Sequence, residues 1–122
     1  MIKNWLLKAE KDVETAEDLY KSKHYDWCLF IWHLAIEKTL KAKILSLNKP
    51  IIYVHDLKRL SREANIILDQ KQTASLNEIT SFNLEARYDD YKLSFYKKAN
   101  KDYAQKWTII CKSMYKLIIT NI

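Results

Sequence analysis

The absence of glycine constrains this chain more than any other feature of its sequence. Among its 122 residues there is no glycine and only one proline, Pro50. Sheet-containing folds of this size usually place glycine in their tight turns, because glycine reaches positive φ angles at little cost. We therefore predict an all-α fold whose helices are joined by loops containing Asn, Asp and Lys. The length fits one hydrophobic core, so residues 1–122 are expected to form a single domain.

The missing glycine also excludes several classes of functional site. The Walker phosphate-binding loop, the dinucleotide-binding fingerprint and the nucleophile elbow of hydrolases all need glycine at fixed positions. The three His and two Cys residues are scattered, with no His pair spaced i,i+4 and no Cys-x-x-Cys motif. We therefore predict no metal site and no cofactor. Cys28 and Cys111 lie in apolar segments and are expected to be buried thiols of a reduced protein.

Apolar side chains that recur every three to four residues predict five helices in an up-and-down bundle. Their expected ranges are about 3–21, 26–47, 57–67, 72–84 and 100–119. Asp26 is expected to cap the second helix, and Ser75 with Glu78 to form a capping box in the fourth. Residues 83–96 are expected to be a polar, tyrosine-rich connection.

The second predicted helix contains the most apolar segment of the chain. Residues 27–36 are apolar on every side except at His33, so this helix must be covered on all sides by its own chain or by a partner. The run is too short to span a bilayer, and lysines follow it directly. We expect it to be the central post of the bundle, with one face left for a second copy in a homodimer. His33 is expected to be either a hydrogen-bonded core residue or a ligand or base that faces a crevice.

The chain is basic, with a formal charge of +6 from 21 basic and 15 acidic residues and a pI near 9.2. Such an excess favours anionic partners, such as nucleotides, nucleic acid or an acidic protein. Only three of the basic residues are Arg, on which sequence-specific nucleic-acid readers rely, so a lysine-rich surface explains the charge equally well. No signal peptide is recognised, and a cytoplasmic location away from membranes is expected.

Glu37, Lys41 and His55 form the first candidate ligand site. Glu37 and Lys41 are spaced i,i+4 on the second predicted helix, which is the spacing of a helical ion pair. Lys38 and Lys41 are expected to lie beside the start of the third helix, where His55 and the free backbone amides suit an anion. The same residues are explained equally well by a surface salt bridge and by a helix cap formed by His55 or Asp56.

Arg87 and Tyr88 form the second candidate ligand site. An aromatic ring next to an arginine suits stacking on a nucleobase and contact with a phosphate. In the alternative, Arg87 forms an ion pair that holds this connection against the bundle. The acidic partners considered for that pair are Asp89, Asp90 and Glu37.

These residues, in this order, resemble the signature of the HEPN domain, whose name stands for higher eukaryotes and prokaryotes nucleotide-binding. The similar segments are His33 to Ala42, His55-Asp56-Leu57 and Arg87-Tyr88, preceded by Ala16-Glu17-Asp18-Leu19. The resemblance covers nearly the whole chain. It implies a five-helix bundle, often dimeric, that is commonly encoded beside, or fused to, a minimal nucleotidyltransferase.

The resemblance also implies a choice between activities. Some members of the family form toxin–antitoxin pairs with the nucleotidyltransferase, some are metal-independent RNases, and others are proposed to bind nucleotides. The RNase branch uses an Arg that is followed four to six residues later by a His. Here every Arg comes after the last His, His55, so that motif is absent. Relatives usually continue Arg-Tyr with Pro-Asp, whereas Asp89-Asp90 follows here.

The functional prediction combines these observations. We expect a non-catalytic HEPN-type module, without catalytic or metal-binding residues, that binds a nucleotide or another phosphate-bearing ligand. The predicted ligand-binding residues are Glu37, Lys41, His55, Arg87 and Tyr88. The expected partners are a second copy and a nucleotidyltransferase, with RNA as a further candidate. The alternative is a toxin–antitoxin component that cleaves RNA at a rearranged site, formed by His33 or His55 with Arg87.

Overall fold

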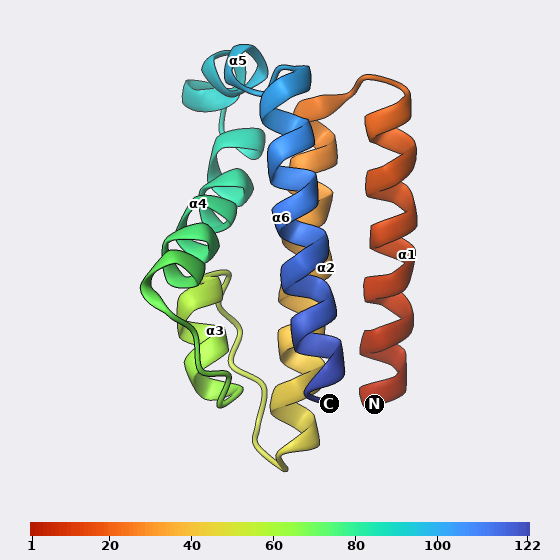
Figure 1. Cartoon of the computed structure of the whole chain (residues 1–122), viewed down its shortest axis with the longest axis vertical. Coiled ribbons are helices and arrows are strands. Elements are labelled where there is room, and N and C mark those ends of the chain that lie inside the picture. The colour runs from red at the N-terminus through yellow and green to blue at the C-terminus, as the bar shows by residue number, and fades with distance from the viewer.

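The computed structural model describes residues 1–122 and is entirely helical (Figure 1). Its six helices are α1 (Ile2–Lys21), α2 (Tyr25–Ser46), α3 (Leu57–Glu63), α4 (Gln70–Arg87), α5 (Asp89–Lys98) and α6 (Lys101–Thr120). The prediction of an all-α bundle is confirmed, but the predicted number of five helices is wrong. No helix is both long enough and apolar enough to cross a membrane.

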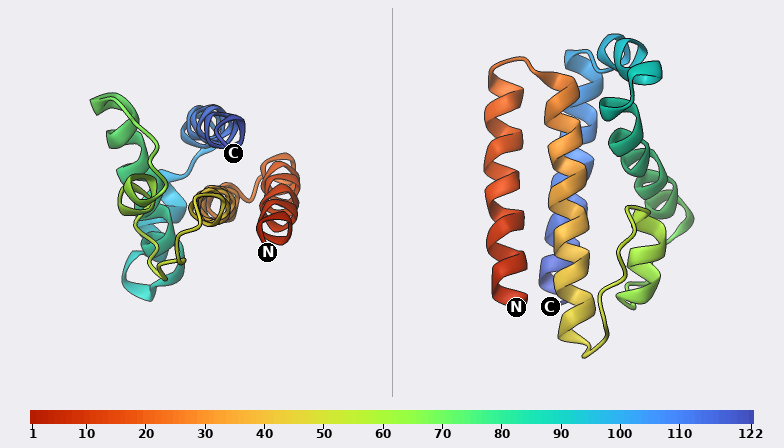
Figure 2. Two further views of the ribbon diagram at one scale, coloured as in Figure 1. Left: turned by 90° about the horizontal axis from the view of Figure 1, so that it is seen from below. Right: turned by 180° about the vertical axis from the view of Figure 1, so that it is seen from behind.

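Helix α2 lies at the centre of the molecule and packs against each of the other five helices. Helix α1 runs antiparallel to it on one side, α6 lies along another side, and α3 and α4 cover a third (Figure 1 and Figure 2). Helix α5 lies at the end of the molecule where α1 turns into α2, and the two chain termini lie at the opposite end. This arrangement confirms the expectation that the apolar segment forms a central post.

The core explains why α2 takes the central position. Its apolar side chains point to several sides of the helix, and most of them are fully buried: Cys28, Leu29, Trp32, Ala35, Ile36, Leu40, Ala42 and Ile44. Burial stabilises each of the large side chains by about 1.5–3 kcal/mol relative to exposure. The two cysteines are buried and free, as expected.

Helix α5 is the helix that the sequence pattern does not predict. The polar composition of residues 83–96 predicts a connection. In the structure α4 extends into this segment as far as Arg87, and α5 begins two residues later, at Asp89. Phe95 is the only buried side chain of α5, and its ring packs against Phe82 of α4 with centroids 5.7 Å apart. Two Asp residues in the first turn and two Lys residues in the last turn complement the helix dipole. A helix with a single buried apolar side chain shows no apolar periodicity in its sequence.

Two of the predicted helix caps are wrong. Asp26 lies in the first turn of α2, and no side chain caps that helix. Helix α4 does have a capping box, but Asp69 and Gln72 form it in place of Ser75 and Glu78. The Asp69 carboxylate accepts from the Gln72 amide, and the Gln72 side chain accepts from the Asp69 amide, so the helix begins two residues earlier than expected.

The ends of the first three helices show how this chain turns without glycine. Lys23, Asn48 and Asn65 have positive φ angles of 67°, 59° and 56°, and each stands two positions after its helix. At the end of α1, the Lys23 amide donates to the Tyr20 carbonyl at 3.1 Å, and the next amide donates to the Leu19 carbonyl at 2.9 Å. This is the Schellman motif, in which glycine is usual and asparagine is tolerated. Of these three residues, Lys23 is therefore the one for which the left-handed conformation costs the most free energy.

The turn at Asn65 also changes the predicted extent of α3. The apolar spacing of the predicted helix 57–67 places Leu57, Leu60, Ala64 and Ile67 on its inner face. The first three are buried, but the prediction for Ile67 is wrong, because Ile67 is 96% exposed. The helix ends before Ile67, because the left-handed residue redirects the chain away from the inner face.

We predict that Lys23→Gly stabilises the protein by about 1 kcal/mol, because glycine removes the cost of a Cβ atom in the left-handed conformation. The free energy of unfolding from urea titrations, followed by circular dichroism, measures this gain. The matched control is Lys21→Gly in the last turn of α1, where glycine should instead destabilise by up to about 1 kcal/mol. A Lys23→Gly variant no more stable than the wild type would contradict this interpretation.

Candidate functional site

A buried carboxylate, Glu37, organises the polar residues near the middle of α2. Lys41 Nζ donates to its Oε2 at 2.9 Å, and His55 Nδ1 donates to its Oε1 at 2.8 Å. Burial alone would raise the pKa of Glu37, but these hydrogen bonds hold that pKa below its usual value. The pair predicted from the i,i+4 spacing is therefore present, in the interior and not on the surface. Lys38 is not beside α3 as expected, because its Nζ lies 2.6 Å from the Asp12 carboxylate of α1.

Lys41 is almost as buried as Glu37 and lies between two aromatic rings. Its Nζ is 5.6 Å from the centroid of the Trp5 ring on α1 and 5.8 Å from that of the Tyr53 ring in the link before α3. The faces of such rings attract a cation. Trp5 and Tyr53 are absent from the predicted site, because tertiary packing alone brings them to Lys41. The Lys41 charge interacts with the Glu37 carboxylate and with these two rings. Lys41 therefore holds the Glu37 side chain in place.

His33 is a hydrogen-bonded core residue, which was one of its two interpretations. Its Nε2 donates to the backbone carbonyl of His55 at 3.1 Å, whereas Nδ1 is buried without a partner. Burial lowers the pKa of His33, and the charge of Arg87 acts in the same direction. The imidazole is therefore neutral near pH 7. His33 and Glu37 together hold His55, one through its backbone and the other through its ring.

The start of α3 offers no free amide to an anion, which excludes one of the two interpretations of this segment. Asp56 caps the helix by accepting from the amides of Lys58 and Arg59. The Leu57 amide donates to Thr80 Oγ1 of α4 at 3.1 Å. The interpretation of Asp56 as a helix cap is thus confirmed, and these three amides are not available to a ligand.

Arg87 is the last residue of α4 and has no acidic partner. Its Nε donates to the Asn83 carbonyl at 3.2 Å, and its guanidinium lies 5.7 Å from the centroid of the Tyr88 ring. All ion pairs of the structure use Lys or His. The alternative in which Arg87 pairs with a nearby carboxylate is therefore wrong.

The structure brings some predicted site residues together and leaves others apart. We call the connected group the Glu37 cluster; it consists of His33, Glu37, Lys41 and His55. Arg87 and Tyr88 form no hydrogen bond to this cluster. The influence of Arg87 on the cluster is electrostatic, since its positive charge contributes to lowering the pKa of His33.

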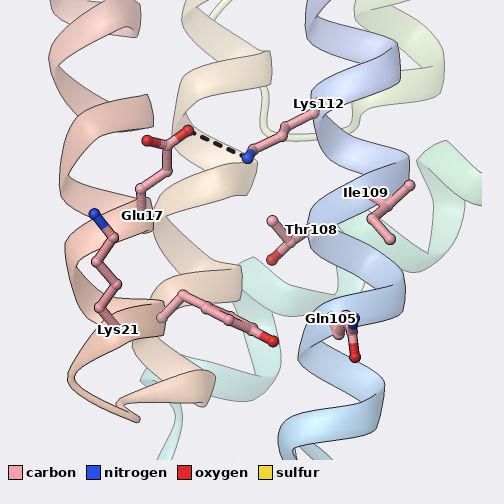
Figure 3. A pocket seen from close by; sticks show the side chains of 7 residues that line it. Glu17, Lys21, Gln105, Thr108, Ile109 and Lys112 are labelled. Carbon is pink, nitrogen blue, oxygen red and sulfur yellow. Dashed lines mark ion pairs between the residues drawn. The ribbon is translucent and has the colours of Figure 1, made fainter.

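The candidate site does not lie in a hollow of the structure. None of the hollows in the structure is lined by the Glu37 cluster, Arg87 or Tyr88. The hollow drawn in Figure 3, of about 300 Å³, lies instead between α1 and α6. No group of three or more His, Cys, Asp and Glu side chains is placed to hold a metal ion. A ligand at the predicted site would be held by charge and by stacking.

Comparison with known proteins identifies the family. The fold is similar to that of TT1696 from Thermus thermophilus, seen in its crystal structure, with 14% identity and a TM-score of 0.86 over 99% of this chain and 98% of that one. At this identity the likeness shows the fold alone. None of the curated proteins matches the chain. The family model of the HEPN domain matches residues 2–121. The resemblance seen in the sequence is confirmed, and the chain belongs to the HEPN domain family.

Proposed function

We propose that this HEPN protein is a non-catalytic module that binds a nucleotide or another phosphate-bearing ligand and acts as a homodimer with a nucleotidyltransferase partner. The observation that carries the ligand proposal is the guanidinium of Arg87, which has no carboxylate to neutralise it. The partner and a toxin–antitoxin role are proposed on the family resemblance.

The chemistry of the exposed groups suits a nucleotide. An arginine presents a planar fork that can donate two hydrogen bonds to one phosphate. The Tyr88 ring is 52% exposed and offers a face for a base. The His55 side chain is 56% exposed, and its Nδ1 is taken by Glu37, so its Nε2 is left for the ligand. Glu37 and Lys41 are then positioning residues that orient His55.

We predict that ATP at ten times its dissociation constant stabilises the protein by about 1.4 kcal/mol and raises Tm by roughly 4–8 °C. Arg87→Ala should abolish the shift, because it removes the charge that meets the phosphates. Thermal denaturation with increasing ATP measures this effect.

The matched control is Arg59→Ala, which removes another exposed arginine without an ion pair, on α3. It should leave the ATP shift unchanged if binding is local to Arg87. An equal loss in both variants would point to nonspecific charge attraction, and no shift at millimolar ATP would refute nucleotide binding at this surface.

The proposed homodimer interface is the open face of α2. Trp27 is 43% exposed and contacts Phe30, with ring centroids 5.8 Å apart. Ile31 and Leu34 are half-buried and continue the same stripe at helical spacing. Figure 2 shows α2 uncovered between α1 and α4 when the molecule is seen from behind. An uncharged apolar stripe does not repel its own copy across a two-fold axis, which makes it suitable for self-association.

We predict that light scattering at micromolar concentration gives twice the 14.6 kDa mass of one chain. Trp27→Glu should yield a monomer, because it places a charge at the centre of the contact. Leu7→Glu alters a comparably exposed apolar residue of α1 (55% exposed) and should remain dimeric. A monomeric wild-type protein would exclude the homodimer.

One observation favours a second candidate function, RNA cleavage at a rearranged site. A carboxylate that accepts from one ring nitrogen of a histidine orients the imidazole and leaves the other nitrogen available as a base. Glu37 stands in this relation to His55. Arg87 would supply the positive charge that such a reaction needs on the phosphate.

Incubation with total RNA separates the two candidates. The binding proposal predicts intact RNA with the wild-type protein. RNA cleavage by the wild type that is lost in His55→Ala and retained in His24→Ala would establish the second function instead. His24 is a suitable control because it is an exposed histidine outside the Glu37 cluster.

A further inference from the structure

The seam between α1 and α6 is a groove that the fold leaves unfilled. Both helices pack closely on α2 but make few direct contacts with each other. Figure 3 shows the hollow between them, with Glu17 of α1 reaching across to Lys112 of α6 and with Lys21 and Thr108 among the other lining residues. The hollow measures about 300 Å³. A groove between two helices that pack on the same underlying helix can accept the side-chain ridge of another helix.

Ile109 forms an apolar ridge beside this groove. Its side chain is 62% exposed, and it lines three separate hollows along α6. The surface of α6 therefore has a ridge with a groove on each side. Helices pack against one another by fitting ridges of side chains into such grooves. Ile110 and Tyr20 add partly buried apolar surface on the two sides of the ridge.

The charges around the ridge are mainly positive. Four lysines line the three hollows, namely Lys21, Lys71, Lys106 and Lys112, against the two carboxylates Glu17 and Asp102. Glu17 is already paired with Lys112 at 3.4 Å, whereas Lys21 and Lys71 have no ion pair. A second copy of this chain would bring the same lysines against each other, which disfavours self-association here.

We propose that the α1–α6 seam binds an amphipathic helix of a partner protein, with apolar side chains along one face and Asp or Glu on both flanks. The apolar face covers Ile109 and enters the grooves, and the carboxylates meet Lys21, Lys71 and Lys106. The seam contains no residue of the Glu37 cluster, Arg87 or Tyr88. This proposal and the proposed nucleotide binding therefore fail independently.

The test uses a fluorescein-labelled peptide of about 18 residues, with Leu at positions i, i+3, i+4 and i+7 and Glu on both flanks of that stripe. Fluorescence anisotropy with the full chain measures its dissociation constant. Two control peptides carry Lys in place of Glu, or the same residues in a scrambled order without an apolar face. We expect only the acidic amphipathic peptide to bind, and to bind more weakly at high salt because the charges are screened.

Variants locate the binding surface. Ile109→Glu should weaken binding by roughly tenfold or more, because it charges the centre of the contact. Leu93→Glu changes an apolar residue of similar exposure on α5 (65% exposed) and should have no effect. The double variant Lys21→Glu and Lys106→Glu should lose the acidic peptide and gain the basic one. Both Lys21 and Lys106 are exposed, so circular dichroism should show an unchanged fold.

Three results would overturn the proposal. The first is an acidic amphipathic peptide that does not bind, or that binds Ile109→Glu as tightly as the wild type. The second is conversion of a dimer to a monomer by Ile109→Glu, which would assign the seam to a second copy. The third is binding to phosphatidylserine vesicles that depends on Ile109 while the peptide fails, which would assign it to a membrane surface. Arg87→Ala should retain peptide binding whether or not it binds ATP.

Discussion

Glu37 accepts hydrogen bonds from Lys41 on its own helix and from His55 in the link before α3, at 2.9 and 2.8 Å. An ionised carboxylate is costly inside a bundle unless it is paired, and removing one partner of a buried pair costs about 3–5 kcal/mol. Lys41 extends the arrangement to α1 through the Trp5 ring. The contact therefore fixes where the link crosses α2, and with it the position of α3 and of the α4 helix packed on it.

The ion pair between Glu37 and Lys41 also determines which basic side chains remain available to a ligand. Lys41 is a natural candidate for phosphate binding in the sequence, but its charge is balanced by Glu37 and it lies between two rings. Arg87 also carries one positive charge and has no acidic neighbour within ion-pairing distance. A guanidinium keeps its charge at every physiological pH and binds phosphate in a planar geometry. The ligand proposal therefore depends on Arg87, with the Glu37 cluster supplying an oriented His55.

Local spacing made part of this structure predictable. The central helix, the ion pair between Glu37 and Lys41, and the helix that carries Trp107 and Cys111 inward all follow from regular intervals along the chain. The contact between Glu37 and His55 joins residues 18 positions apart and depends on how the link folds back, which no interval encodes. Helix α5 was unpredictable for a related reason, since Phe95 is its only buried side chain and one residue makes no periodic pattern. The absence of glycine indicated the fold class. It did not indicate which residues adopt the left-handed conformation in place of glycine, because that depends on where each helix ends.

The two uncovered surfaces of the bundle differ in charge, and this difference is the reason why we propose different occupants for them. The open face of α2 carries Trp27 and Ile31 without a formal charge, so two copies can meet there without repulsion. The α1–α6 seam surrounds Ile109 with lysines, so it attracts carboxylates and repels its own copy. The open face and the seam lie on different sides of α2 (Figure 1 and Figure 2). A dimer formed through the first would leave both seams exposed, and each copy could then hold one acidic helix. Two-fold symmetry in the pair would thus produce two equal partner sites.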